Sequence, residues 1–212
     1  MDLRDLRYWV FDMDGTLTVP IHDFDAIRAQ LALPPGRPIL EEISARPADE
    51  RDALTARLDL IESELATRAC PQPHAQHLLA WLAARTRIGV LTRASRPNAI
   101  TTLAACGLDR HLRPEYILGR DDCAPKPAPD GIRRLLALWS GAAERSAVVG
   151  DYLWDLLAGR AAGATTIYLD STGAFPHRAH ADLCVRSLGE LVERLDPRYA
   201  SRRSASPVTA AD

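Results

Sequence analysis

The stretch Leu6-Arg7-Tyr8-Trp9-Val10-Phe11-Asp12-Met13-Asp14-Gly15-Thr16 is the part of the sequence that decides the fold. Residues Leu6 to Phe11 are mostly apolar or aromatic, which is typical of a buried β-strand. The apolar run stops at Asp12, and the acidic and glycine residues that follow indicate a loop. The carboxylates of Asp12 and Asp14 are therefore expected directly after a buried strand.

Strand-like and helical patterns alternate along the chain after residue 73. Apolar, strand-like segments span 87–91, 115–118, 146–149, 165–169 and 183–185, and helical patterns span 78–84, 98–106, 129–139, 153–162 and 188–195. Strands that alternate with helices of this length predict a parallel sheet. The expected fold class is therefore α/β, with a Rossmann-like parallel sheet.

The segment between the first strand and residue 73 has a different pattern. Apolar residues recur there at helical spacing in three groups, which Pro34-Pro35-Gly36 and Pro47 separate. Because no strand pattern occurs in this segment, we expect a small all-helical cap inserted after the first strand. The predicted division is a core of 1–17 and 74–200, a cap of 18–73, and a disordered polar tail of 201–212.

Length, charge and cysteine spacing exclude several classes of protein. A chain of 212 residues suits one domain that carries a smaller insert. The net charge of −2 gives no basic field for nucleic acid, and the apolar stretches are too short to span a bilayer. The acidic N-terminus does not resemble a secretory signal, and the four cysteines form no Cys-x-x-Cys pair. We therefore expect a cytoplasmic monomer or homodimer with free thiols.

A single lysine, Lys126, stands among the 26 basic residues. A general preference for arginine explains the excess of arginine but not the one exception. Lysine is a compact point charge on a flexible stem, whereas arginine is a planar fork, so a site shaped for one need not accept the other. Lys126 is therefore a candidate site residue.

Polar side chains follow four of the predicted strands. They are Asp12 and Asp14 after the first, Thr92 and Arg93 after the second, Lys126 in the loop after the third, and Asp151 and Asp155 after the fourth. Ligands of an open parallel sheet bind at the carboxyl ends of its strands, so these groups are expected to converge. Clustered carboxylate oxygens need a cation, and a site with few protein ligands and room for phosphate suits Mg²⁺.

This set of groups predicts phosphoryl transfer. Asp12 would attack phosphorus and form an aspartyl-phosphate, while the cation and Lys126 offset the repulsion between the two anions. Asp14 would protonate the leaving oxygen and later take a proton from water. Thr92 would donate its hydroxyl to the phosphoryl oxygens. The amides of the Met13–Thr16 turn would cradle the same oxygens, with Gly15 permitting the turn.

Four motifs resemble those of the haloacid dehalogenase-like (HAD) hydrolase superfamily. They are Asp12-Met13-Asp14-Gly15-Thr16-Leu17, Val90-Leu91-Thr92, Pro125-Lys126-Pro127-x-Pro129-Asp130 and Gly150-Asp151-Tyr152-Leu153-Trp154-Asp155. They occur in order, each where a predicted strand ends, and the likeness extends from Leu6 to about Leu195. The segment after the first motif resembles the helical cap of phosphoglycolate phosphatase-like members.

The resemblance implies further roles for the site residues. Asp12, the backbone carbonyl of Asp14, and Asp151 would hold Mg²⁺, and Asp155 would position Lys126 or a metal-bound water. The cap would supply substrate contacts and close over the site. The sequence departs from the commoner pattern at Tyr152, where serine is frequent, and at Arg93, where asparagine often follows the threonine. Arg93 and the cap residue Arg37 are candidate substrate-binding residues, and a solvated surface position is the alternative for each.

The leading hypothesis is a Mg²⁺-dependent phosphatase that hydrolyses a small phosphorylated metabolite. A phosphomutase acting on a sugar phosphate shares the same motifs and is the first alternative. A dehalogenase is disfavoured, because dehalogenases of this superfamily lack the second acid, here Asp14. A catalytically silent module that binds a phospho-ligand is the remaining alternative. The complete set of polar groups argues against that module.

Overall fold

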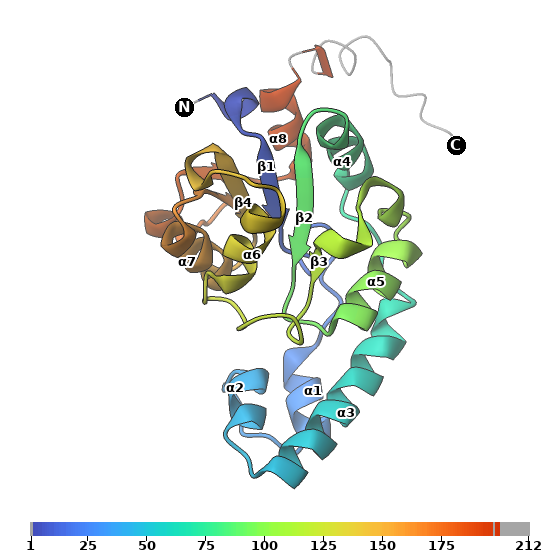
Figure 1. Cartoon of the computed structure of the whole chain (residues 1–212). Helices are drawn as coiled ribbons and strands as arrows, with labels where there is room; N and C mark the ends of the chain where they lie inside the picture. Colours follow the sequence, from blue (N-terminus) through green and yellow to red (C-terminus); the bar gives the residue numbers. More distant parts are fainter. Residues whose placement is uncertain (1, 197, 200–212) are drawn as a thin grey trace, which may run out of the picture.

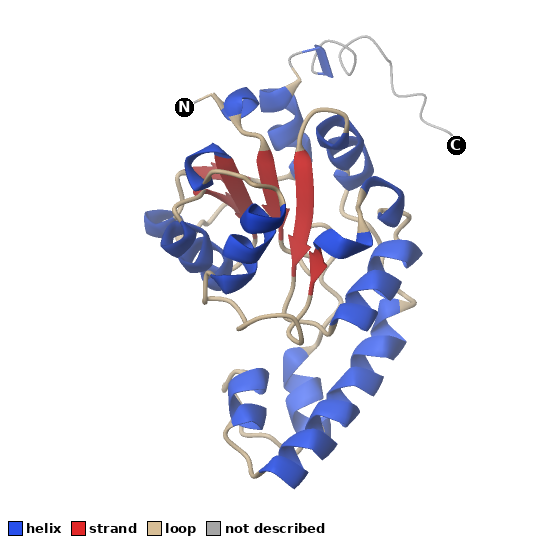
Figure 2. Cartoon of the chain, in the orientation of Figure 1, coloured by secondary structure: helices blue, strands red, loops and turns tan. Residues whose placement is uncertain are grey.

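Six parallel β-strands form the centre of the molecule (Figure 2). In this computed structural model, which describes residues 2–196 and 198–199, the strands span Tyr8–Phe11 (β1), Arg87–Leu91 (β2), Ile117–Leu118 (β3), Ser146–Gly150 (β4), Thr165–Leu169 (β5) and Leu183–Val185 (β6). They are hydrogen-bonded in the order β3-β2-β1-β4-β5-β6, and each neighbouring pair is parallel. The α/β prediction is confirmed. The predicted tail, 201–212, lies outside the described residues.

Helices cover both faces of the sheet, because alternate residues of each strand point to opposite sides. In β1, Trp9 and Phe11 pack in one apolar cluster with α4 (Ala75–Ala83), α5 (Arg96–Ala105) and α8 (Leu188–Leu195). Val10 packs in a second cluster with α6 (Asp130–Leu138) and α7 (Leu153–Ala162). Trp9 and Phe11 are fully buried, which stabilises the fold by about 2–3 kcal/mol for each side chain.

Strand β1 lies at the point where the strand order reverses. β2 pairs with it on one side and β4 on the other, so Tyr8 lies opposite both Arg87 and Ser146. A crevice opens at such a point outside the carboxyl ends of the strands. The topology thereby places the residues that follow β1, β2 and β4 around one space.

Three helices between β1 and α4 form the predicted helical cap: α1 (Phe24–Gln30), α2 (Ile39–Ser44) and α3 (Ala48–Ala66). They enclose their own apolar cluster, which includes Ile27, Leu31, Ile43 and Leu58. The carboxylate of Asp23 caps α1 by accepting a hydrogen bond from the Ala26 amide at 2.9 Å. Figure 1 shows α3 running beside the core helix α5, with α1 and α2 below the sheet.

The two segments that join the cap to the core lie side by side. The amide of Val19 donates to the Cys70 carbonyl, and the amide of Gln72 donates to the Leu17 carbonyl, both at 2.9 Å. Thr18 also forms an isolated bridge with Pro71. These contacts support a division near residues 18 and 73, and the exact boundaries stay a prediction.

The predicted strands and helices match the structure apart from some end residues. β1 begins at Tyr8 because Leu3–Asp5 forms a 3₁₀ turn before it. Glu115 and Tyr116 were expected in a strand but belong to the 3₁₀ turn Pro114–Tyr116, and only Ile117–Leu118 pairs with β2. Cys70, Cys106, Cys123 and Cys184 are free thiols. Within the described part of the chain, no helix has the length and apolarity needed to cross a membrane.

Candidate active site

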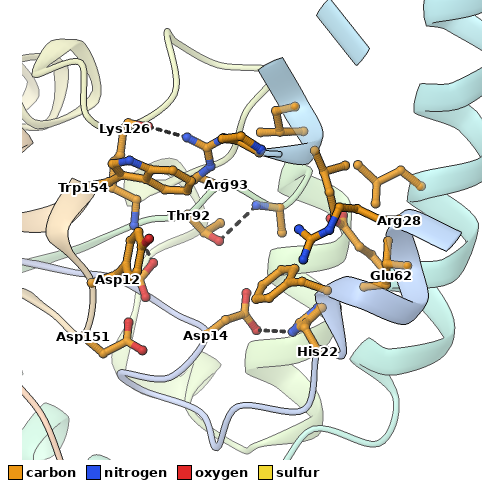
Figure 3. A pocket seen from close by; sticks show the side chains of 18 of the residues that line it. Asp12, Asp14, His22, Arg28, Glu62, Thr92, Arg93, Lys126, Asp151 and Trp154 are labelled. Atoms are coloured by element: carbon orange, nitrogen blue, oxygen red, sulfur yellow. Dashed lines mark hydrogen bonds and ion pairs between the residues drawn. The ribbon is translucent and has the colours of Figure 1, made fainter. Parts of the chain in front are cut away.

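A cavity of about 450 Å³ lies between the cap and the carboxyl ends of the strands. Figure 3 shows its side chains converging from both sides. Its core residues include Asp12, Asp14, Thr92, Arg93, Lys126, Asp151, Tyr152, Trp154 and Asp155. The cavity therefore brings together the predicted catalytic side chains from all four motifs.

The turn after β1 directs Asp12 and Asp14 toward this cavity. The Asp12 amide extends the sheet by donating to the Val149 carbonyl at 2.9 Å, and the Met13 carbonyl then accepts amides of the turn, including those of Leu17 and Thr18 at 2.9 Å. Gly15 has φ +85°, a region that glycine adopts without strain. A Cβ on Gly15 would lie 2.1 Å from Asp151 Oδ2, so glycine is also needed for the close approach of Asp151.

The predicted amide cradle is not formed by every amide of the Met13–Thr16 turn. The Gly15 amide donates to the Thr18 carbonyl at 3.0 Å, and the Thr16 amide donates to the Met13 carbonyl at 3.2 Å. Both amides therefore stabilise the turn itself. The predicted phosphate contacts of the Met13–Thr16 amides stay a prediction, with the Gly15 and Thr16 amides already used by the turn.

Lys126 lies at the centre of the acidic groups. Its ammonium is 2.5 Å from Asp12 Oδ1 and 2.5 Å from Asp155 Oδ1, and the residue is only 4% exposed. Burial alone would lower the pKa of Lys126, but the two carboxylates outweigh it and raise that pKa above its ordinary value. Asp155 is itself fixed, since its Oδ2 accepts the Tyr152 amide at 3.1 Å. Asp155 thus holds Lys126 against Asp12.

Three carboxyl groups surround the single ammonium of Lys126. Asp12, Asp151 and Asp155 have carboxylate oxygens within 4.8 Å of one another. Burial, reinforced by the charges of Asp12 and Asp155, raises the pKa of Asp151 to about 8. Burial is the larger cause, and the repulsion from Asp12 and Asp155 adds to it, which a bound cation would relieve.

The donor set fits a divalent cation. Asp12 and Asp151 present hard carboxylate oxygens, and the contact between Gly15 and Asp151 leaves no space for a side chain between them. Asp155 belongs to the same cluster, although its oxygens already accept hydrogen bonds from Lys126 and Tyr152. The cluster could therefore bind a metal, with Asp12 and Asp151 as the better placed carboxylates.

Asp14 lies apart from the carboxylate cluster, on the side of the cavity near the cap (Figure 3). Its Oδ1 is 3.5 Å from Nδ1 of His22, and burial lowers the pKa of His22, which favours the neutral ring. Burial and the nearby charges of Asp12 and Glu62 raise the pKa of Asp14 to about 7. Asp14 is thus a carboxyl group in an environment that favours its protonated form.

Thr92 is buried at the end of β2. Its Oγ1 accepts the Ala94 amide at 3.1 Å, which leaves its own hydroxyl proton for another acceptor. The structure therefore places a donor at the position where the sequence predicts one.

Arg93 joins the core to the cap. Its Nη2 contacts Glu41 of α2 at 2.8 Å and 2.7 Å, and its Nη1 donates to the Lys126 carbonyl at 2.5 Å. Its guanidinium stacks 4.1 Å from the ring centre of Trp154. Arg93 is thus a half-buried bridge between core and cap rather than a solvated loop residue. Glu41 was not identified from the sequence, because a glutamate on a short helix has no local signal. Trp154 stands in the fourth motif, but its contact with Arg93 was not predicted.

Two cap arginines border the cavity. The Arg37 side chain is 69% exposed and its Nε lies 3.5 Å from Glu42, so it stands at the rim. Arg28 of α1, which the sequence analysis did not identify, is 15% exposed and extends into the cavity (Figure 3). The Arg37 carbonyl accepts a hydrogen bond from Arg28 Nη1 at 3.3 Å. The predicted substrate-binding role of Arg37 stays a prediction.

The parallel sheet, the acidic site at its carboxyl edge and the helical cap define a capped, Rossmann-like α/β enzyme. The chain belongs to the haloacid dehalogenase-like hydrolase family, whose model matches residues 7–163, and it is therefore a hydrolase. The family resemblance predicted from the four motifs is confirmed.

Known proteins with similar sequences or structures agree with this assignment. A haloacid dehalogenase-like hydrolase domain-containing protein of Arabidopsis thaliana is 32% identical over 187 residues, which cover 80% of this chain and 73% of the plant protein. A Lactobacillus plantarum structure with the provisional name phosphoglycolate phosphatase is 17% identical, with a TM-score of 0.73 and coverage of 89% of this chain and 99% of that one. CbbY of Rhodobacter sphaeroides, solved with phosphate, is 24% identical, with a TM-score of 0.67 and coverage of 88% and 96%. At these identities the two structures show the shared fold.

Proposed function

We propose that this hydrolase is a Mg²⁺-dependent phosphatase that cleaves a small-molecule phosphate monoester through an aspartyl-phosphate on Asp12. The observation that carries the proposal is the environment of Asp12. Its carboxylate ends the central strand, faces the cavity and is held by Lys126 at 2.5 Å beside a second carboxylate, Asp151. A carboxylate fixed by a buried lysine is suited to nucleophilic attack on a phosphate dianion.

Lys126 orients the nucleophile. Because Lys126 holds Oδ1 of Asp12, we assign Oδ2 as the oxygen that attacks phosphorus. The new bond joins this oxygen to phosphorus while the bond from phosphorus to the leaving alcohol breaks. The ammonium of Lys126 offsets negative charge on the transferring group. The hydroxyl of Thr92 donates a hydrogen bond to a phosphoryl oxygen.

Asp14 is assigned the proton transfers. It stands on the cap side of Asp12, where the leaving alcohol would lie, and gives its proton to the leaving oxygen. In the second half of the reaction, Asp14 takes a proton from the water that attacks the aspartyl-phosphate. Inorganic phosphate and the free Asp12 carboxylate result, so protons and bonds balance over the cycle.

Asp12, Asp151 and the backbone carbonyl of Asp14 would hold the Mg²⁺ ion. The bound ion would supply charge neutralisation between the nucleophile and the phosphate dianion. Asp155 keeps Lys126 in place, and Gly15 admits Asp151 to the site. The cap of 18–73 would close over a small phosphorylated metabolite and exclude water.

A phosphate-release screen tests the proposal. Purified enzyme with Mg²⁺ is expected to release phosphate from at least one ester in a panel of sugar phosphates, phosphoglycolate, nucleotides and phospho-amino acids. The Asp12→Asn variant is expected to release none while its circular dichroism spectrum stays unchanged. Asp109→Asn, at an exposed position far from the cavity, is the matched control and is expected to keep full activity.

Other outcomes of the screen would favour the alternatives. Isomerisation of a sugar phosphate that a bisphosphate stimulates, without phosphate release, would indicate a phosphomutase. Binding of a phospho-ligand without turnover of any ester would indicate a silent binding module. Full activity of Asp12→Asn would refute the covalent mechanism.

A further inference from the structure

Arg28 is a cation inside the cavity with part of its hydrogen-bonding capacity unused. Its Nη2 pairs with Asp25 at 2.6 Å and its Nη1 donates to the Arg37 carbonyl at 3.3 Å. Its Nε is buried, and among the described residues none accepts a hydrogen bond from it. A buried donor without an acceptor is costly to the free protein, so an acceptor supplied by a ligand would be favoured.

The partners of Arg28 do not neutralise it. The Asp25 side chain is 83% exposed, so its attraction for Arg28 is screened by water. Glu62 lies near Arg28 in Figure 3 but pairs with the buried Arg120 at 2.8 Å. Arg28 therefore presents positive charge to the space that Asp14 and Thr92 also face (Figure 3).

The walls around Arg28 are apolar. The cap and the core contribute Phe24, Ile27, Ile39, Leu40, Leu58 and Trp154 to the lining. Phe24 is 55% exposed, so its ring is accessible to a ligand in the cavity. These apolar surfaces suit a ring or a hydrocarbon chain, while polar side chains such as His22 and Glu62 complete the lining.

The size of the cavity also argues against a very small leaving group. At about 450 Å³ it lies within the range of about 300–1,000 Å³ found for pockets that hold drug-sized ligands. A two-carbon alcohol such as glycolate would fill only a small part of this volume. The leaving group must extend from the phosphate toward the cap to contact the apolar walls and Arg28.

We propose that the substrate is a phosphate monoester whose leaving alcohol has an apolar or aromatic body and a carboxylate or similar anionic group, and that Arg28 selects this group. The inference rests on the proposed phosphatase function and specifies its substrate class. Arg28 would bind the anionic group through its fork, since a guanidinium matches a carboxylate in geometry and charge. The apolar walls would hold the body of the alcohol between this group and the phosphate.

A pair of aryl esters tests the inference. Phenyl phosphate and 4-carboxyphenyl phosphate differ by one carboxylate, and the preference is the ratio of their kcat/KM values. The two esters differ in intrinsic reactivity, but this difference is the same for every enzyme variant. It therefore cancels when the preference of a variant is divided by that of the wild type. Arg28→Gln is expected to lower the preference for the carboxylated ester by about tenfold to a hundredfold relative to wild type. This is the effect expected when a charge-assisted hydrogen bond is lost.

Arg57→Gln is the matched control. Arg57 is an exposed cap arginine that donates to the Gln30 carbonyl at 2.7 Å and does not line the cavity, so its substitution is expected to keep the wild-type preference. Arg28→Lys is expected to give an intermediate preference, because it keeps the charge and loses the fork. Asp25→Asn is expected to raise the preference, because it removes the competing carboxylate.

The outcomes separate this inference from the proposed function. Equal preferences in wild type and Arg28→Gln, within about twofold, would overturn the assignment of Arg28 while leaving the phosphatase proposal intact. If Arg28→Gln does not fold, an unchanged preference in both Arg28→Lys and Asp25→Asn would overturn it instead. Absence of any Mg²⁺-dependent release above the Asp12→Asn blank, from these esters and from the wider panel, would count against both proposals.

Discussion

Gly15 and Gly163 have similar backbone angles but different surroundings, and the comparison separates strain from function. Their φ values are +85° and +80°. A Cβ on Gly163 would meet its nearest neighbour, Ala143, at an ordinary 3.5 Å, whereas a Cβ on Gly15 would overlap Asp151 Oδ2. Both changes therefore introduce backbone strain, and only one displaces a carboxylate of the site.

We predict that Gly15→Ala lowers kcat/KM by at least about a hundredfold, because Asp151 must move from the position where it faces Asp12. Gly163→Ala is expected to cost about 1 kcal/mol in the free energy of unfolding and to keep its activity. Steady-state kinetics and urea unfolding measure the two effects. Equal activity losses in both variants would show that strain, rather than the position of Asp151, governs the effect at Gly15.

The solitary lysine leads to a second prediction at the scale of one residue. Lys126 contacts Asp12 and Asp155 at 2.5 Å each in a site where it is 4% exposed, so a longer, planar guanidinium does not fit. Lys126→Arg is expected to lower kcat by about a hundredfold or more although the positive charge is kept. A kcat near the wild-type value would show that the site does not require lysine at position 126. Arg113→Lys, at a mostly exposed arginine, is the matched control and should leave kcat unchanged.

At the scale of elements, the pair of Arg93 and Glu41 links β2 to the cap helix α2. The two side chains are 18% and 46% exposed, so the pair is worth at most about 1 kcal/mol. Glu41→Gln is expected to raise KM by up to about fivefold, because it lowers the fraction of molecules in which the cap is positioned for binding. The measurement is KM at low and high salt, and the variant should lose part of the salt dependence of the wild type.

Glu50→Gln is the control for this element. Glu50, in the first turn of α3, pairs at 3.3 Å with Arg46, which precedes the helix, and neither residue lines the cavity, so the loss of this pair should leave KM unchanged. A KM that rises equally in both variants would mean that general cap stability, rather than the contact with Arg93, determines binding.

The sequence could predict the strands and the residues that follow them, but not what the cap contributes to the site. Apolar runs such as Tyr8–Phe11 and Thr165–Leu169 are local signals, and the acids and the threonine that follow the strands converge because parallel topology requires it. The contribution of the cap depends on how helices pack. Arg28 follows the buried Ile27 directly, so only the orientation of α1 decides whether it faces solvent or the cavity. Arg37 has a local signal, because it follows the Pro34-Pro35-Gly36 turn, whereas Arg28 has none.

At the scale of the whole molecule, the unbalanced acids couple metal binding to stability. Asp12, Asp151 and Asp155 repel one another in a buried site, and Lys126 compensates only part of their charge. A cation that binds the folded site and not the unfolded chain stabilises the fold by about 2.7 kcal/mol when present at a hundred times its Kd. For a chain of this size, that corresponds to a rise in Tm of about 5–10 °C.

We therefore predict that Mg²⁺ raises the Tm of the wild-type protein and that a chelator reverses the rise. Asp151→Asn should unfold at a similar or higher Tm without Mg²⁺, because asparagine removes a carboxyl group that repels its neighbours when ionised, and should respond little to the ion. Differential scanning fluorimetry with and without Mg²⁺ measures both effects independently of turnover. Asp109→Asn should respond like the wild type. An equal Mg²⁺ response in Asp151→Asn and wild type would place the cation elsewhere and remove Asp151 from the proposed ligands.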